Sequence, residues 1–183
     1  MKKFDIKEIL VPTISLFLIS AIVTLLLAVT NSVTAPKIEQ LQIETANKTK
    51  AQVLSVATSF SEEKTVDLNG ATYTYYEGYN DSKNIVGYVF TTSAKGYGGD
   101  ISTMVGVKND GTVSGVDFLS ISETAGLGMN ADSDDFKSQF VGKSGVIGVN
   151  KNTSTDTEIQ ALTGATITSK AVTNAVNIAL ELF

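Results

Sequence analysis

The order of apolar and polar positions divides the chain into two parts of different character. In the first part, an uncharged run, ILVPTISLFLISAIVTLLLAVT, occupies positions 9–30. This run approaches the ~20 predominantly apolar residues that a helix needs to span a bilayer. The polar stretch that follows, at 31–60, has a patchy apolar stripe at helical spacing. The pattern therefore predicts a transmembrane helix at 9–30 and a second helical segment at 31–60.

Three other kinds of helix compete with a membrane anchor for the apolar run. A buried core helix would be shorter, and a cleaved signal peptide has an apolar region of roughly 7–15 residues with a small-x-small exit. An amphipathic surface helix needs a polar face, which this run lacks. We therefore expect an uncleaved, single-pass anchor, and a cleaved signal peptide is the main alternative.

The lysines on either side of the apolar run predict its orientation. Lys2, Lys3 and Lys7 precede the run, whereas only Lys37 closely follows it. Loops on the cytoplasmic side of a membrane carry an excess of lysine and arginine. Residues 1–8 are therefore predicted to be cytoplasmic, and the larger C-terminal part is predicted to lie on the extracytoplasmic side of the cell membrane.

Both prolines of the chain are expected near the start of a helix, where the missing N–H costs little. Pro12 is predicted in the first turn of the span, and Pro36 at the first position of the helix that follows. Residues 31–60 have two interpretations. They form either a stalk between the membrane and the C-terminal domain or a packed first helix of that domain.

From Thr65 onward the apolar period changes from helical to extended. Four β-branched and aromatic runs, separated by turn residues, predict strands. Asn109-Asp110-Gly111 is a strong hairpin signal between the last two of them. The four runs are ATYTYYEGY, IVGYVFTTSA, ISTMVGVKND and GTVSGVDFLSI.

After the strands, the pattern predicts a short helix, a short strand and a final helix. DSDDFKSQFVGK offers Asp132 or Ser133 as an N-cap, and GVIGV at 145–149 reads as a strand. The expected fold class is α+β, with an antiparallel sheet flanked by helices in a domain at 61–183. In the closing segment TSKAVTNAVNIALELF, one helical face is apolar: Ala171, Val172, Ala175, Val176, Ala179 and Leu182.

Composition excludes several kinds of chemistry. The net charge is −5 and every basic residue is a lysine, which argues against nucleic-acid binding because phosphate neutralisation needs a dense basic patch. The sequence contains no Cys and no His. Iron–sulfur clusters, thiolate catalysis, disulfides, the usual haem and zinc ligands and a Ser-His-Asp base are therefore excluded. No metal site is expected, and redox chemistry would require an organic cofactor.

The segment LTGATITS at 162–169 carries an unusual cluster of hydroxyl groups just before the last predicted helix. A helix N-terminus offers free N–H groups and a positive dipole end, which bind anions. The simplest alternative is that Thr168 caps the helix. A cap needs one hydroxyl, however, and this turn supplies four: Thr163, Thr166, Thr168 and Ser169.

Two glycine-rich segments accompany this turn. SETAGLG at 122–128 follows a predicted strand, and KGYGGD at 95–100 lies between two strands. Glycines allow a tight turn and a close approach to the backbone. Taken singly, each loop is a weak signal, because neither has the strand–GxGxxG–helix context of a dinucleotide fold or the Gly-Lys-Ser/Thr of a P-loop.

A membrane anchor followed in order by KGYGG, SETAGLG and LTGATITS resembles the FMN-binding-domain family over nearly the whole chain. Within that family, the sequence is similar to the G subunits of Rnf-type ion-translocating ferredoxin–NAD oxidoreductases and to the related C subunits of sodium-translocating NADH–quinone oxidoreductases. The resemblance implies that a flavin transferase joins the phosphate of FMN to Thr166 as a phosphoester.

The resemblance also implies which residues surround the cofactor. Hydroxyls of the turn and the helix N–H groups would surround the phosphate, and the SETAGLG loop would line the isoalloxazine ring. Two positions depart from the family pattern: Gln160 stands where an acidic residue is usual, and Ala125 replaces a proline. The residues expected to bind the cofactor, besides Thr166, are Thr163, Gly164, Ala165, Thr168, Glu123, Thr124, Gly126, Leu127 and Gly128.

The function that the resemblance implies is electron transport. The protein would be a flavoprotein subunit of an Rnf-type complex that couples ferredoxin–NAD electron transfer to sodium or proton transport, and thus a non-autonomous redox subunit of a translocase. Its partners would be the other membrane subunits and the flavin transferase. The alternatives are a free-standing, membrane-anchored flavoprotein in extracellular electron transfer or an anaerobic reductase, and a non-catalytic sensor or adhesin domain. Companion subunits in the genome neighbourhood would favour the complex.

Overall fold

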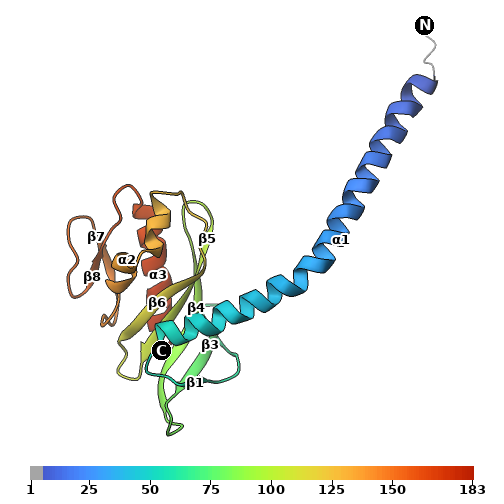
Figure 1. Cartoon of the computed structure of the whole chain (residues 1–183). Helices are drawn as coiled ribbons and strands as arrows, with labels where there is room; N and C mark the ends of the chain where they lie inside the picture. Colours follow the sequence, from blue (N-terminus) through green and yellow to red (C-terminus); the bar gives the residue numbers. More distant parts are fainter. Residues whose placement is uncertain (1–5) are drawn as a thin grey trace. The chain divides into compact units, whose positions relative to one another are not determined.

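The computed structural model describes residues 6–183 and separates into two compact units, of which the first ends at Glu44 and the second is Thr45–Phe183. The predictions for Lys2 and Lys3 lie outside the described residues. Figure 1 labels most of the elements, which are α1 Ile6–Val53, β1 Ser59–Phe60, β2 Lys64–Leu68, β3 Ala71–Tyr79, β4 Ile85–Lys95, β5 Asp100–Lys108, β6 Val113–Ser120, the 3-10 helix η1 Gly128–Asp132, α2 Asp134–Ser138, β7 Gly148–Asn150, β8 Glu158–Gln160 and α3 Thr166–Leu182.

Helix α1 is continuous from Ile6 to Val53 and contains both prolines. The prediction that Pro12 lies in the first turn is wrong, because the helix begins six residues earlier. The prediction that Pro36 begins a second helix is also wrong. No glycine interrupts the chain between Ile6 and Val53, so nothing but the two prolines opposes a single helix. A proline inside a helix removes one backbone hydrogen bond but does not always end the helix.

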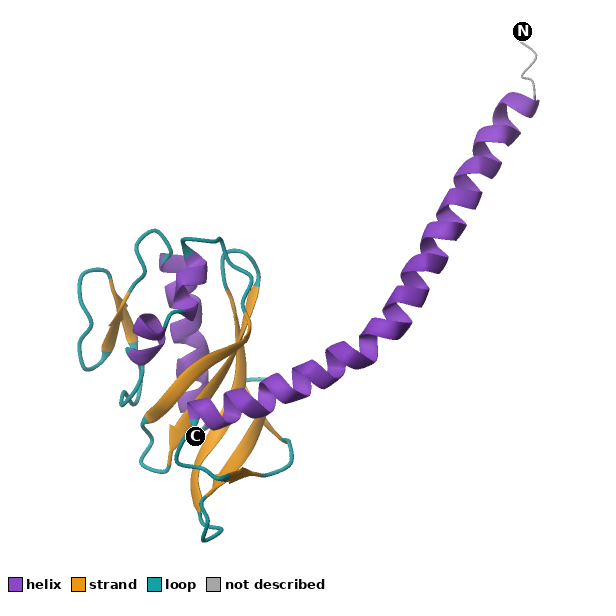
Figure 2. Ribbon diagram, viewed as in Figure 1, coloured by secondary structure: helices purple, strands orange, loops and turns teal. Residues whose placement is uncertain are grey.

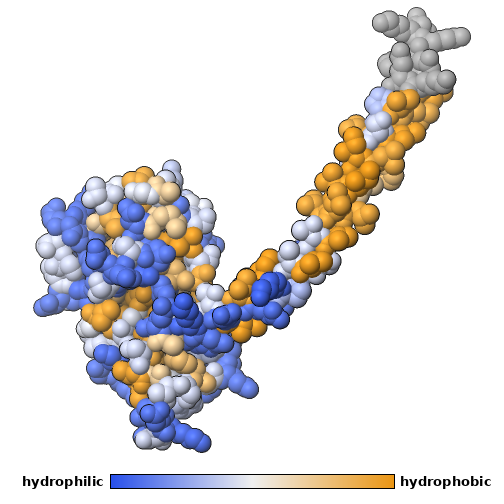
Figure 3. Space-filling model, viewed as in Figure 1, coloured by the Kyte–Doolittle hydropathy of each residue, from blue (hydrophilic) through white to orange (hydrophobic). Residues whose placement is uncertain are grey.

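The apolar part of α1 is long and apolar enough to cross a membrane, judged by its length and composition alone. At 1.5 Å per residue, the segment 9–30 extends about 33 Å, slightly more than the ~30 Å hydrocarbon core of a bilayer. Its large apolar side chains are exposed in the isolated chain. Figure 3 shows them as a nearly continuous apolar surface along this part of the helix.

The second unit is built on a six-stranded antiparallel sheet (Figure 2). Its strand order is β1-β3-β4-β5-β6, and β2 pairs with β3 beside β1. The four runs predicted as strands form β3 to β6, and the predicted hairpin joins β5 to β6. Gly111 lies at the turn with φ +78°, a conformation that glycine adopts without steric cost.

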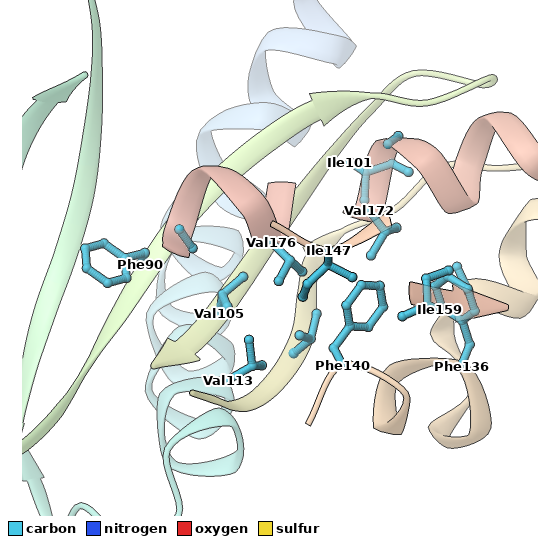
Figure 4. Close-up of a cluster of buried hydrophobic side chains, with 14 of the residues drawn as sticks. Phe90, Ile101, Val105, Val113, Phe136, Phe140, Ile147, Ile159, Val172 and Val176 are labelled. Carbon is cyan, nitrogen blue, oxygen red and sulfur yellow. The ribbon is translucent and has the colours of Figure 1, made fainter. Parts of the chain in front are cut away.

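The sheet has a hydrophobic cluster on each face, because successive residues of a strand point to opposite sides. On one face Val89 and Met104 pack with Leu54, which directly follows α1. On the other, Phe90 and Val105 pack with α2 and α3 (Figure 4). The last turns of α1, from Thr45, therefore belong to the same compact unit as the sheet.

Helix α2 and strand β7 precede the C-terminal helix. Of the two N-cap residues that the sequence offers, Asp132 and Ser133, the structure has Ser133, whose side chain accepts a hydrogen bond from the Phe136 N–H. The strand predicted at 145–149 begins too early, because β7 starts only at Gly148. Gly145 has φ +65°, which a strand does not allow, and the Ile147 N–H donates to Asn177 of α3 instead of a neighbouring strand. Strand β7 pairs in parallel with β8.

Helix α3 covers one face of the sheet with the apolar face that the sequence predicts. Of the six predicted residues, five are buried and Leu182 is half-buried against the same cluster. The alternative interpretation, in which Thr168 caps this helix, is wrong. The N-cap residue is Ala165, and the helix begins at Thr166. The α+β fold class, with an apolar N-terminal helix and an antiparallel sheet flanked by helices, is confirmed.

Candidate functional site

A cleft of about 520 Å³ opens at one end of the second unit. This volume lies in the range of about 300–1,000 Å³ that is usual for small-molecule and cofactor sites. Three segments meet there: the turn between β4 and β5, the loop after β6, and the N-terminus of α3. The lining residues are Tyr97, Glu123, Thr124, Leu127, Gly128, Gly164, Ala165, Thr166, Ile167 and Thr168.

The sheet brings these distant segments together. Lys95 pairs with Asp100 where β4 turns into β5, and Ser102 pairs with Ser120 at the end of β6. Both connections therefore leave the sheet at the same end. Helix α3 is fixed across the sheet by the buried Thr92 hydroxyl of β4, which donates to the Ala175 carbonyl oxygen at 2.9 Å.

The Glu123 carboxylate joins all three segments. One oxygen, Oε1, accepts hydrogen bonds from the backbone N–H of Tyr97 at 2.9 Å and of Gly98 at 3.1 Å. The other oxygen, Oε2, accepts a hydrogen bond from the Thr168 hydroxyl at 2.9 Å. We call these three bonds the Glu123 clasp. Hydrogen bonds to a charged group are stronger than those between neutral groups, so the clasp holds the two loops and the first turn of α3 in register.

Glycines, among them Gly98 and Gly128, allow the segments to approach so closely. A Cβ atom on Gly98 would lie 2.2 Å from the carbonyl oxygen of Ser122. A Cβ atom on Gly128 would lie 2.6 Å from Glu123 Oε2 and 2.7 Å from Thr168 Oγ1. All three distances are far shorter than a van der Waals contact, so any other residue at either position would displace the clasp.

Two of the four hydroxyls in the α3 turn are already used to build it. Thr168 is 1% exposed and belongs to the clasp. Ser169 is fully buried, and its hydroxyl donates to the Ala165 carbonyl oxygen and accepts from the Leu162 N–H, both at 3.0 Å. Thr166, in contrast, is half-buried and lines the cleft.

The N-terminus of α3 has the character of an anion site. No side chain caps it, so the N–H groups of its first turn have no side-chain acceptor. The cleft lining includes no lysine. An anionic group in this cleft would therefore be held by backbone N–H groups and the helix dipole. A phosphate beside an apolar planar group matches this arrangement, because Leu127 and Ile167 line the same cleft. The cleft thus fits FMN.

Most residues that the sequence singles out lie together in this cleft. Thr163 and Gly126 are exposed and do not line it. The sequence does not single out two lining residues: Tyr97, in the glycine-rich loop at 95–100, and Ile167, which stands between two threonines. The only feature of the sequence that could have identified Tyr97 and Ile167 is their position in KGYGGD and LTGATITS, respectively. Within residues 6–183, no group of three or more acidic side chains is placed to hold a metal ion.

Comparison with known proteins agrees with this geometry. Residues 96–181, which contain all three segments of the cleft, match the family model of the FMN-binding domain. The chain is similar to the G subunit of the Na(+)-translocating ferredoxin:NAD(+) oxidoreductase complex of Acetobacterium woodii, with 35% identity over 92% of this chain and 88% of the relative. It is also 38% identical to the G subunit of the proton-translocating complex of Clostridium ljungdahlii, over 86% of this chain and 82% of the relative.

Solved structures agree at the level of the fold. The C subunit of the Na(+)-translocating NADH-quinone reductase from Parabacteroides distasonis matches 60% of this chain and 59% of its own, with 25% identity and a TM-score of 0.51. NqrC of Shewanella oneidensis matches 69% of this chain and 66% of its own, with 20% identity and a TM-score of 0.53. Since the G subunits match nearly the full chain at more than 30% identity, this protein belongs to the family of G subunits of ion-translocating oxidoreductase complexes.

Proposed function

We propose that this protein is the electron-carrying subunit of a membrane-bound, Rnf-type complex and carries FMN as a phosphoester on Thr166. The observation that carries the proposal is the position of Thr166 in the cleft, at the uncapped N-terminus of α3. The G subunits of Acetobacterium woodii and Clostridium ljungdahlii belong to complexes named for sodium and proton translocation, respectively. The coupling ion therefore differs between relatives, and either ion is compatible with this chain.

The residues of the cleft would hold the two ends of FMN differently. The N–H groups of the first α3 turn would bind the phosphate, and the apolar side chains of Leu127 and Ile167 would contact the ring system. When bound, FMN supplies the capacity to accept and pass on electrons one or two at a time. The protein contributes position and a partly enclosed surrounding. Glu123 would act by fixing both loops around the ring.

The proposed attachment conserves atoms without any change in oxidation state. The Thr166 oxygen forms a bond to the phosphorus of an activated FMN donor, a dinucleotide supplied with the transferase. The pyrophosphate bond of the donor breaks, the second nucleotide leaves as a monophosphate, and the hydroxyl proton passes to a base of the transferase. A phosphate monoester carries about −1.5 to −2 charges at pH 7. Conversion to a diester lowers that charge, which suits a cleft lined without lysine.

The hydrogen bonds of the turn favour Thr166 over its neighbours. The Thr168 hydroxyl donates to Glu123 and is buried, so a transferase would have to break the clasp to reach it. Thr163 is exposed but does not line the cleft. A flavin joined to Thr163 would therefore start from outside the space that fits its ring.

We also propose that α1 anchors the protein in the cell membrane, with residues 1–8 in the cytoplasm and the FMN-binding domain at 61–183 on the extracytoplasmic side. The apolar segment 9–30 supports the anchor, and the distribution of lysines around it supports the orientation. The other membrane subunits of the complex and the flavin transferase would be its partners.

The test compares two threonine variants of the full-length protein, each produced together with an active flavin transferase. Thr166→Ala is expected to abolish flavin fluorescence of the band on a denaturing gel, and Thr163→Ala to retain it. Intact mass should show one FMN less one water in the wild type and in Thr163→Ala only. Because Ala165 is the N-cap residue, Thr166→Ala removes no cap, and we expect a stability change within about 0.5 kcal/mol. A fluorescent Thr166→Ala band would refute the attachment site.

A further inference from the structure

Tyr97 combines a fixed backbone with a free side chain. It lies in the turn between β4 and β5, which is closed by a hydrogen bond from the Gly96 N–H to the Gly99 carbonyl oxygen at 2.8 Å. The Tyr97 N–H donates to Glu123 Oε1. The side chain, however, is 73% exposed although it lines the cleft. This tyrosine therefore contributes little to the folded core, and its ring is available to a ligand.

The Glu123 clasp fixes Tyr97 relative to the proposed attachment site. The carboxylate binds the turn of Tyr97 through one oxygen and Thr168 through the other. Thr168 is two residues from Thr166 in the first turn of α3. A single side chain therefore sets the position of the Tyr97 turn against the start of the helix, and close approach at Gly98 leaves the turn little room to shift.

The chemistry of the cleft mouth suits a flat, conjugated ligand. Tyr97, Leu127 and Ile167 all line the cleft, and Leu127 and Ile167 are 44% and 55% exposed. An aromatic ring offers a large, rigid apolar face and stacks favourably on another ring system, a contribution of about 0.5–1.5 kcal/mol beyond the area that it buries. Among the residues that line the cleft, Tyr97 is the aromatic one.

We propose that Tyr97 is a positioning residue for the flavin, whose ring stacks on the isoalloxazine and covers it from solvent, and that the Glu123 clasp holds Tyr97 in place. This inference rests on the proposed attachment of FMN to Thr166. Stacking by Tyr97 gives the flavin one preferred orientation in an open cleft, where the bond to Thr166 alone would leave the ring free to rotate.

The first test uses the full-length protein in detergent after intact mass has shown one FMN per chain. Tyr97→Ala is expected to raise the iodide quenching constant of flavin fluorescence several-fold and to reduce the visible circular dichroism of the flavin. Tyr97→Phe keeps the ring and should behave like the wild type. The matched control is Tyr73→Ala, a half-buried tyrosine of β3 outside the cleft, which should change neither signal.

The second test separates positioning by the clasp from stacking by the ring. Glu123→Gln keeps an oxygen that accepts from both N–H groups, whereas Glu123→Ala removes it. In a Thr166→Ala background without covalent flavin, amide hydrogen exchange at Tyr97 and Gly98 should be several-fold faster with Glu123→Ala than with Glu123→Gln. In the flavinylated protein, Glu123→Ala should reproduce the loss of circular dichroism seen with Tyr97→Ala.

The outcomes distinguish this inference from the proposal on which it rests. Unchanged quenching and circular dichroism in Tyr97→Ala would overturn stacking, and equal changes in Tyr97→Phe and Tyr97→Ala would assign the effect to the hydroxyl instead. Equal exchange in the two Glu123 variants would overturn the role of the clasp. If the attachment proposal is wrong, this is seen before either test, because the wild-type mass lacks FMN or the Thr166→Ala protein still carries it.

Discussion

Replacement of Gly98 by alanine is expected to separate the two loops that form the cleft. The new Cβ would lie 2.2 Å from the Ser122 carbonyl oxygen and 3.4 Å from the Cα atom of Glu123. Both are backbone atoms, so rotation of a side chain does not relieve the conflict, and the turn must move away. The hydrogen bonds from the Tyr97 and Gly98 N–H groups to Glu123 would then be lost.

The size of the effect follows from these two bonds. Both lie in exposed loops, where water replaces a lost partner, so each contributes about 0.5–1.5 kcal/mol, and the pair about 1–3 kcal/mol. Alanine also restricts the unfolded chain, which offsets about 0.4–1 kcal/mol of that loss. The net expectation for Gly98→Ala is a decrease of up to about 2.6 kcal/mol in the free energy of unfolding.

Gly99 provides a control at the next position. A Cβ there meets no atom within 4 Å, and its φ lies outside the left-handed region. Gly99→Ala should therefore leave stability unchanged or raise it by up to about 1 kcal/mol through the unfolded chain. Urea unfolding of the full-length proteins in one detergent measures the difference. Equal stabilities for the two variants, or a more stable Gly98→Ala, would refute the close packing of the two loops.

Two further predictions concern the opposite face of the sheet. Leu54 is fully buried, so Leu54→Ala should lower the free energy of unfolding by about 2–5 kcal/mol in the same urea assay. The control is Val56→Ala: the Val56 side chain is 48% exposed, so this change should alter the free energy of unfolding by no more than about 0.5 kcal/mol. Burial and the hydrogen bond to Glu63 raise the pKa of Tyr76 from 10.0 to about 12. Because the folded state retains this proton more tightly, the associated stability is intact below pH 10 and is lost as the pH rises toward 12. Tyr76→Phe should flatten that part of the pH–stability curve, and identical curves would contradict the assignment.

Local patterns in the sequence determine most of the fold. The β-branched runs predicted β3 to β6, and the 3.6-residue period predicted the buried face of α3. The errors lie where a distant contact decides the backbone. The Ile147 N–H donates a hydrogen bond to the side chain of Asn177, thirty residues away, so β7 starts later than its apolar residues indicate. The continuity of α1 through Pro36 has a different, local cause, because a proline signal gives only a preference for a helix start.

The candidate site was predictable in its residues but not in its connections. The motifs identified Glu123 and Thr166, and both line one cleft. The resemblance predicted only that the loop of Glu123 lines the flavin ring. In the structure its partners lie 25, 26 and 45 residues away, and no local pattern encodes such contacts. Tyr97 was missed for the same reason, because its place in the cleft depends on the clasp.

Helix α3 begins without a stabilising side-chain cap, and the proposed function explains this loss of stability. Ser, Thr, Asn or Asp at an N-cap stabilises a helix by about 0.5–2 kcal/mol relative to alanine, yet the N-cap here is Ala165, in a turn that contains four hydroxyls. Thr168 and Ser169 bond to Glu123 and to the turn itself. None of these hydroxyls caps the helix, so its first N–H groups remain available to a ligand. A turn selected for stability alone would place a hydroxyl at position 165. In a turn that must bind a phosphate, such a hydroxyl would occupy the N–H groups that the phosphate needs.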